Sequence, residues 1–380
     1  MSSSLSRFCQ SAAIGFALST LPAVAGIDLV TTPAPPEDQI DLELEEYVPF
    51  SGTPTGITDE EKASIVRACD ELAAHPGNAE NPEGISGVLY DAINANKALP
   101  ACITAVEVLP NDKRMRYQLA RAKQASGQGR DAIRDLIELA DEGYIAAINN
   151  LGATYQLGIG VKRDYAEALI WYEKAANKGF VPSMAVLGWM YHSGKGTPKD
   201  SVKAVEWYRK AANGGSASAM FNVGHMYNNG WGVEIDPEKA AEWFHRSAQG
   251  GFGQGMTMTA WTYQTGRGVV ADGNKAIDWY KRAANIGELS AVGALGGFYD
   301  TGGSGTAPKP KKAAEWLLRA VMEGHAPTRK RLLEEPQTLQ HETRRAIQSQ
   351  LTALGFDAGP ADGVFGSKTR QALNAAFDTP

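Results

Sequence analysis

Histidine, cysteine and acidic side chains, which carry most catalysis and metal binding in proteins, are scattered along this sequence of 380 residues. The six histidines form no His-Glu-x-x-His pair and join no cysteine at the spacing of a zinc site. No Gly-x-Ser-x-Gly turn, glycine-rich phosphate loop or motif-placed carboxylate pair is present. We therefore expect no catalytic residue, no metal site and no cofactor.

The first 25 residues have the layout of a secretory signal peptide. Arg7 provides a positive start, and residues 12–21 form an apolar run that is too short to span a bilayer. Ala23-Val24-Ala25 is a small-x-small cleavage site. The alternative, a buried first helix, fits poorly with the acidic, proline-rich tract that follows. We predict export to the periplasm and a mature chain without a membrane span.

Cleavage would remove Cys9 and leave two cysteines, Cys69 and Cys102, in an oxidising compartment. There they are expected to form a disulfide, worth about 3–4 kcal/mol in the chain-entropy model. Two buried free thiols are the alternative. No histidine pairs with either cysteine in a recognisable motif, so neither is expected to be reactive.

The middle of the chain repeats the same pattern, and adding 36 to the residue numbers of one copy gives the next. The last copy keeps Tyr299 and Trp316, with one extra residue in its loop. A fixed period of this length is typical of a solenoid. The first copy contains Leu151-Gly152, Tyr155, Gly158, Gly160, Asp164, Ala168, Trp171-Tyr172, Ala175 and Gly179.

Each copy predicts two helices joined by a glycine-containing loop. Leu151, Gly152 and Tyr155 fall on one helical face, and the residues around Trp171 repeat that rhythm. Asp164 suits the N-cap of the second helix, with Glu167 placed to complete a capping box. One such hairpin cannot bury its apolar face alone, so we expect stacked hairpins that share a continuous core.

The pattern LGxxYxxGxGVxxDxxxAxxWYxxAAxxG resembles the Sel-one-like repeat, a relative of the tetratricopeptide repeat. The resemblance covers roughly half of the chain and implies an all-α, right-handed α-solenoid of five repeats over residues 146–324. It also implies a protein-interaction scaffold with no chemistry of its own. The last copy departs from the pattern, because Lys309-Pro310 replaces the aspartate cap and Leu317 replaces an aromatic residue.

Two segments precede the repeats. Residues 26–57 are acidic and proline-rich with few core-forming side chains, which predicts a disordered linker. Residues 58–145 read as an N-terminal tetratricopeptide-like capping segment that contains the predicted disulfide. The run Thr58-Asp59-Glu60-Glu61 is a capping box, and a later helix is expected to start at Tyr117 after the Pro110-Asn111-Asp112 break.

Residues 325–380 form a different module. The string IQxxLxxLGFxxGPxDGxFGxxTRxAL resembles the small three-helix peptidoglycan-binding domain. The resemblance implies a shallow surface for the stem peptide or sugar of the cell wall. In the alternative interpretation Asp362 only turns the chain and Thr369 only caps locally. A module this short has a marginal core, so it is expected to lean on the last repeat. The implied binding residues are Asp362, Gly363, Phe365, Thr369 and Arg370.

Two sets of aromatic residues recur in the repeats. The tryptophans of the second helices follow the core phase, which favours burial over a binding ladder: Trp171, Trp207, Trp243, Trp279 and Trp316. A position two residues before each repeat tyrosine points away from the Leu/Tyr face and holds Trp189, His225 and Trp261 in the middle copies. These three are our candidates for a partner-binding groove. Packing against the adjacent helix is the alternative for them.

The net charge of −6 and the absence of a basic stripe argue against nucleic acid as a partner. We predict a non-enzymatic periplasmic scaffold whose solenoid binds a protein and whose C-terminal module binds peptidoglycan. Two alternatives remain open at this point. One is a periplasmic regulator of a sensor or secretion system, with the C-terminal module a structural cap. The other is a wall-remodelling enzyme with a site that the sequence does not reveal.

Overall fold

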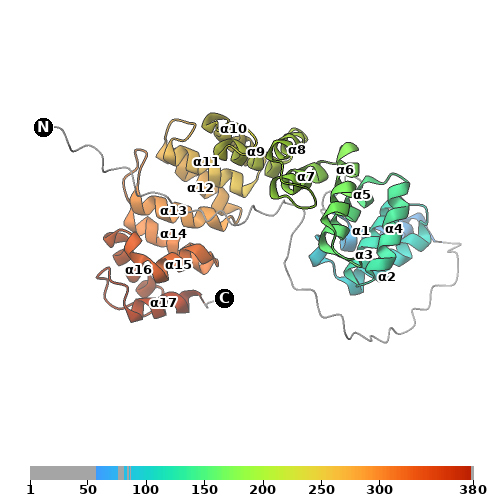
Figure 1. Ribbon diagram of the computed structural model, residues 1–380. Coiled ribbons are helices and arrows are strands. Elements are labelled where there is room, and N and C mark those ends of the chain that lie inside the picture. Colours follow the sequence, from blue (N-terminus) through green and yellow to red (C-terminus); the bar gives the residue numbers. More distant parts are fainter. Residues whose placement is uncertain (1–56, 76–80, 84, 86, 378–380) are drawn as a thin grey trace.

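A computed structural model describes residues 57–75, 81–83, 85 and 87–377 of the chain. Over these residues the regular structure is helical, apart from one isolated bridge between Gly303 and Thr306, so the all-α prediction is confirmed. The helices follow one another as a curved stack (Figure 1). The predicted signal peptide and nearly all of the predicted linker lie outside the described residues.

The N-terminal unit contains α1 (Asp59–Ala73), the short 3-10 helix η1 (Tyr90–Ala92), α2 (Ala95–Val108), α3 (Lys113–Ala125) and α4 (Gly129–Asp141). The predicted capping box of α1 is present: the Glu61 carboxylate accepts the Thr58 N–H at 2.8 Å, and Thr58 Oγ1 accepts the Glu61 N–H at 3.2 Å. The predicted start of α3 at Tyr117 is wrong. The helix begins at Lys113, because the Asp112 carboxylate accepts the N–H groups of Arg114 and Met115.

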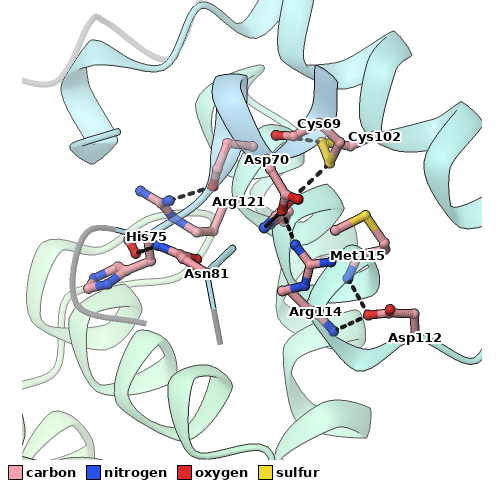
Figure 2. Close-up of polar contacts among 11 residues, drawn as sticks. Cys69, Asp70, His75, Asn81, Cys102, Asp112, Arg114, Met115 and Arg121 are labelled. Carbon is pink, nitrogen blue, oxygen red and sulfur yellow. Dashed lines mark hydrogen bonds and ion pairs between the residues drawn. A yellow bond between two sulfur atoms is a disulfide. The ribbon is translucent and has the colours of Figure 1, made fainter. Parts of the chain in front are cut away.

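Cys69 of α1 and Cys102 of α2 form the predicted disulfide (Figure 2). Both residues are fully buried in one apolar cluster with Ala73, Ala98 and Met115. The bridge therefore joins the first two helices across the core that they share with α3.

Reduction of the disulfide is expected to lower the free energy of unfolding of the N-terminal unit by about 3 kcal/mol, because the reduced unfolded chain gains loop entropy. The paired substitution Cys69→Ser with Cys102→Ser should give a similar loss, as measured by hydrogen exchange of α1 and α2 peptides. Peptides from α11 and α12 are the internal control and should be unchanged. Equal exchange of α1 in the two redox states would contradict a stabilising role.

The solenoid consists of five hairpins whose ten helices have 13 residues each. In chain order the first and second helices of the hairpins are α5 (Ile145–Leu157) and α6 (Tyr165–Asn177), α7 (Val181–Ser193) and α8 (Ser201–Asn213), α9 (Ala217–Asn229) and α10 (Pro237–Gln249), α11 (Gly253–Thr265) and α12 (Gly273–Asn285), and α13 (Leu289–Thr301) and α14 (Pro310–Met322).

The loops inside the first four hairpins repeat the same caps, whereas Lys309 of the fifth makes no side-chain cap. In the second hairpin Gly194 ends α7 in the left-handed conformation, and the Asp200 side chain accepts the Lys203 N–H to cap α8. The Asp200 N–H donates to Tyr191 O at 2.8 Å, and the other hairpins repeat this contact. The predicted capping box at Glu167 is wrong, because the Asp164 N–H that its carboxylate would accept donates to Tyr155 O instead.

In the first two hairpins, close contact between the two helices depends on the glycine of the Leu-Gly pair. A Cβ at Gly188 would lie 2.5 Å from the Tyr208 ring, and one at Gly152 would lie 2.8 Å from the Tyr172 ring. The second-helix tyrosines are consequently buried. This packing explains why glycine and a large aromatic residue recur together in the sequence.

We expected the repeat tryptophans to lie inside the core, but they lie at its boundary. Each is half-buried, and a basic residue three positions later covers its ring. A cation over an indole face is attracted to the ring quadrupole. Each pair therefore stabilises the tryptophan side chain on the surface of its second helix. The pairs, with cation-to-centroid distances, are Lys174–Trp171 (3.8 Å), Lys210–Trp207 (4.0 Å), Arg246–Trp243 (4.1 Å), Arg282–Trp279 (4.7 Å) and Arg319–Trp316 (4.9 Å).

The C-terminal module contains α15 (Ala326–Glu334), the 3-10 helix η2 (Pro336–Thr338), α16 (His341–Ala353) and α17 (Ser367–Phe377). It has no separate core. Leu317, Leu318 and Val321 of α14 belong to the same buried cluster as Ile347, Leu351, Phe365 and Leu373 of the module. The expectation that the module leans on the last repeat is confirmed.

Polar contacts reinforce this junction. The Asp300 side chain at the end of α13 is fully buried, accepts the Gln340 N–H at 3.0 Å and lies 3.8 Å from the Arg331 guanidinium. Arg331 also donates to Thr338 Oγ1 at 3.0 Å. Asp300 therefore connects the last repeat to the start of α16. The module and the solenoid are packed against each other and share one core.

Removing residues 336–380 should expose the apolar side of α14 and destabilise the remaining solenoid. We expect the melting temperature of the solenoid to fall by about 5 °C or more, because several buried aliphatic side chains become solvated. Circular dichroism and binding of an apolar dye would report the change. Removing residues 26–56 is the matched control and should leave melting unchanged. An unaltered melting curve for the shortened chain would show that the two parts are independent.

Candidate functional site

The first helices have a third face beside those that contact the second helix of the hairpin and the preceding first helix, and this third face is only partly accessible. On α7, Gly188 contacts Tyr208 of the second helix, and Ser183 donates to Asn149 of the preceding first helix at 2.8 Å. The third face of α7 holds the buried Val186 and the half-buried Trp189. Residues spaced at i, i+4, i+7 and i+11 form this side in the middle repeats. We call it the first-helix face: Pro182, Val186, Trp189 and Ser193 on α7, Ser218, Asn222, His225 and Asn229 on α9, and Gln254, Met258, Trp261 and Thr265 on α11.

The structure places all three partner-binding candidates on the first-helix face. Trp189, His225 and Trp261 are each half-buried. Trp189 also packs against the apolar clusters of two hairpins. The rings of Phe221 and Phe244 lie edge-on to His225, with centroids 4.4 and 5.1 Å away. Trp189 therefore combines accessible surface with support from two hairpins, while His225 is mainly a packing residue.

The first-helix face is uncharged. Helices α5, α7, α9, α11 and α13 contain no lysine, arginine or glutamate, and their one aspartate is the buried Asp300. Burial lowers the pKa of His225 to about 4, and burial together with Lys199 lowers the pKa of His192. Both histidines are therefore neutral at pH 7. The charged side chains of the hairpins lie on the second helices and loops instead.

The five residues implied for peptidoglycan binding lie together in the loop before α17 and in its first turns, but they differ in accessibility. Phe365 and Thr369 are buried, and Thr369 Oγ1 donates to Ala358 O at 2.7 Å. Arg370 is exposed and donates to Leu333 O of α15 at 2.7 Å. Asp362 is exposed and its carboxylate accepts the Val364 N–H at 2.8 Å. The Val364 N–H, with Gln348, lowers the pKa of Asp362, which is therefore a carboxylate at neutral pH.

Gln348 of α16 makes the hydrogen bonds that hold this loop, and the sequence analysis gave it no role. Its side-chain oxygen accepts the Gly363 N–H at 2.7 Å. Its amide nitrogen donates to Val364 O at 3.0 Å and to Thr369 Oγ1 at 3.2 Å. The glutamine of the IQxxL string was the available signal for it. Gly363 and Thr369 therefore hold the loop in shape, which leaves Asp362, Arg370 and the 66%-exposed Val364 at its surface.

Within the described part of the chain, histidine, cysteine and acidic side chains form no group of three that could hold a metal ion. None of the described helices combines the length and apolar character needed to cross a membrane.

Comparison with known families agrees with the hairpin geometry. The Sel1 repeat model matches five consecutive segments: residues 145–180, 181–216, 217–252, 253–288 and 291–325. The crystal structure of a Sel1 repeat protein from Oxalobacter formigenes is 31% identical, and the match covers 61% of this chain and 96% of that protein with a TM-score of 0.52. The chain belongs to the Sel1 repeat family. Its C-terminal segment 340–376 matches the peptidoglycan binding domain model.

A second solved structure shows the same fold over a longer stretch of this Sel1 repeat protein. The crystal structure of c5321, a protective antigen of uropathogenic Escherichia coli strains with an SLR fold, is 22% identical and has a TM-score of 0.57. The match covers 83% of this chain and 68% of that protein. No curated protein sequence matches the chain.

Proposed function

We propose that this Sel1 repeat protein is an exported, non-enzymatic scaffold of the periplasm. Its solenoid binds a protein partner through Trp189 and Trp261 of the first-helix face, with His225 holding the surface between them. Its C-terminal domain binds peptidoglycan through the exposed part of the loop around Asp362. The Sel1 repeats support a scaffold role, and the peptidoglycan-binding domain and the Cys69–Cys102 disulfide support a location in the cell envelope.

The observation that carries the proposal is the shared core of α14 and the C-terminal domain. Because the two surfaces belong to one packed body, a partner on the solenoid would be held at a fixed position relative to the cell wall. A flexibly linked anchor would only raise the local concentration of the partner.

Co-sedimentation of the full chain with purified peptidoglycan sacculi tests the wall-binding part. Asp362→Asn keeps the acceptor for the Val364 N–H but removes the charge, and Val364→Glu alters the most exposed apolar side chain of the loop. We expect the double variant to lose at least about 10-fold in affinity, as for a small contact surface centred on these two residues. Asp357→Asn, at an exposed carboxylate of the same module, is the matched control.

A second candidate function follows from the same shared core. In it the C-terminal domain is the cap of a solenoid that regulates a sensor or secretion partner, as the buried Phe365 and the Arg370 contact with Leu333 favour. Failure of the wild-type chain to sediment with sacculi would support this function. Release of soluble muropeptides by the full chain would instead indicate a wall-remodelling enzyme.

A further inference from the structure

The loops that follow α3, α5 and α7 lie against one another and form a continuous edge of the molecule. A Cβ at Gly160 would lie 2.4 Å from the backbone of Gly129, and one at Gly196 would lie 2.2 Å from Tyr165 O. Each loop therefore contacts the hairpin before it. We call the exposed basic residues of these loops the basic loop edge: Arg130, Lys162, Arg163, Lys195 and Lys199.

The positive charge of this edge exceeds the negative charge around it. The same loops and the first turns of α4, α6 and α8 contain six basic and four acidic residues. Asp164 and Asp200 accept backbone N–H groups at the starts of α6 and α8, and Asp131 pairs with Arg134 at 3.4 Å. Among the described residues, none of the five side chains of the basic loop edge forms an ion pair.

The basic loop edge is a bounded patch. The second helices begin there, and the N-terminus of a helix adds partial positive charge. The charge reverses in the third hairpin, whose loop and first turn contain Glu234, Asp236 and Glu238 against Lys239. The five basic residues come from three separate loops over residues 130–199, which is why the sequence shows no basic stripe.

The acidic tract at the start of this chain has the opposite charge. Between Asp28 and Glu46 it contains seven acidic and no basic residues. About a dozen residues connect Glu46 to Thr58, and they span up to about 40 Å when extended. The tract is therefore attached to the molecule by a connection of known maximum length.

That length is enough to reach the basic loop edge. α1 runs parallel to α3, because Asp70 contacts Gln118 and Ala73 contacts Arg121. The first residue of α1 therefore lies at the opposite edge, and its 15 residues span about 22 Å. Successive hairpins are about 10 Å apart, so the three loops lie roughly 25–40 Å from the start of α1.

We propose that residues 37–46 of this chain dock on the basic loop edge of the same molecule, with their carboxylates beside Lys162, Lys195 and Lys199. The inference goes beyond the proposed function and does not rest on it. A short tether gives an effective concentration in the mM range, which favours even weak contacts. Exposed ion pairs contribute little to folding stability, so loss of the tract leaves melting unchanged.

Carbodiimide cross-linking tests the contact in the chain expressed from residue 26. The reagent joins a carboxylate to a lysine amine where the two are in contact. We expect mass spectrometry to find residues 37–46 joined to Lys162, Lys195 or Lys199. The yield should fall at least about 5-fold between 50 and 500 mM NaCl, because salt screens exposed charges. A mixture of ¹⁴N- and ¹⁵N-labelled chains should give cross-links within one copy only.

A labelled peptide of residues 36–50 measures the same contact as a binding constant. It should bind the chain expressed from residue 57, and at least about 10-fold more weakly the chain from residue 26, whose own tract competes. Lys195→Glu with Lys199→Glu should weaken peptide binding at least about 10-fold, because like charges then face each other. Lys311→Glu with Lys312→Glu makes the same charge change at exposed positions of α14 and is the matched control, expected within about 2-fold of wild type.

Several results would overturn the inference. Cross-links between ¹⁴N and ¹⁵N copies would assign the contact to a dimer. Equal loss of binding in the two charge-reversed variants would show non-specific attraction, and no peptide binding at 50 mM NaCl would show none. Phosphatidylglycerol vesicles that bind equally with and without residues 26–56 would show that the edge is open to an anionic membrane. None of these outcomes bears on sacculus binding, so the proposed function is tested separately.

Discussion

Replacing Asp70 with alanine is expected to lower the free energy of unfolding of the N-terminal unit by about 3–5 kcal/mol. Asp70 of α1 is 1% exposed, and its carboxylate accepts hydrogen bonds from Arg114 and, at 2.7 Å, from the Gln118 side chain of α3 (Figure 2). Alanine would leave a largely buried guanidinium and a buried amide without their acceptor. The uncompensated charge accounts for most of this cost, because the substitution removes only a carboxylate and no buried apolar group.

The neighbouring Glu71→Ala is the matched control for Asp70→Ala. Glu71 pairs with Arg67 on the same helix at 2.8 Å, but the two side chains are 53% and 69% exposed. An exposed pair of this kind contributes little, so the control should lose less than about 0.5 kcal/mol. Hydrogen-exchange mass spectrometry of α1 and α3 peptides measures both variants locally. Comparable protection in Asp70→Ala and Glu71→Ala would show that the buried carboxylate does not hold α1 to α3.

Much of the fold was predictable because its determinants are periodic. Three features recur along the chain: a Leu-Gly pair, an aspartate cap and a Trp-Tyr pair. They indicate the faces and the ends of the helices, and the five hairpins lie where this pattern predicts them. The Cys69–Cys102 bridge was predictable from cysteine count and compartment. These features depend on local spacing or on composition, both of which a single sequence displays.

The candidate sites were predictable only in part, because a motif does not show what its residues contact. Phe365 and Thr369 belong to the motif because they shape the loop. The Phe365 side chain lies in the shared core, and Thr369 Oγ1 donates to Ala358 O. Gln348 holds that loop from a helix 14 to 21 residues earlier in the chain.

The junction between the solenoid and the C-terminal domain bears most directly on the proposed function. Sequence alone marks a change of module near Gly324 and predicts, from the shortness of the module, that it leans on the last repeat. The structure shows the contacts: the core of α14 continues into α16 and α17, and Asp300 and Arg331 join the last repeat to α15 and the start of α16. A scaffold built this way would transmit orientation, because the shared core holds the first-helix face in place relative to the loop around Asp362.

That rigidity depends on contacts between successive hairpins, and the second glycine of the loop in the second, third and fourth hairpins makes one of the closest. Gly232 has φ +72°, and a Cβ there would lie 2.2 Å from Ser201 O at the start of α8 in the preceding hairpin. Gly232→Ala should therefore lower the free energy of unfolding by about 4 kcal/mol. Strain of an alanine in the left-handed region contributes about 1 kcal/mol or more, and the displaced loop loses packing against α8 for the remainder.

Gly251→Ala separates these two contributions. Gly251 has φ +85°, but a Cβ there meets nothing within 4 Å, so its substitution carries the backbone strain without the collision. We expect a loss of only about 1 kcal/mol for Gly251→Ala. Urea unfolding followed by tryptophan fluorescence compares the variants, with hydrogen exchange of the α8 and α9 peptides locating the change. Because each hairpin depends on its neighbours, the Gly232 effect should reach both peptides. If the two alanine variants unfold at the same urea concentration, the loop does not join the hairpins, and the solenoid must owe its rigidity to the helix contacts alone.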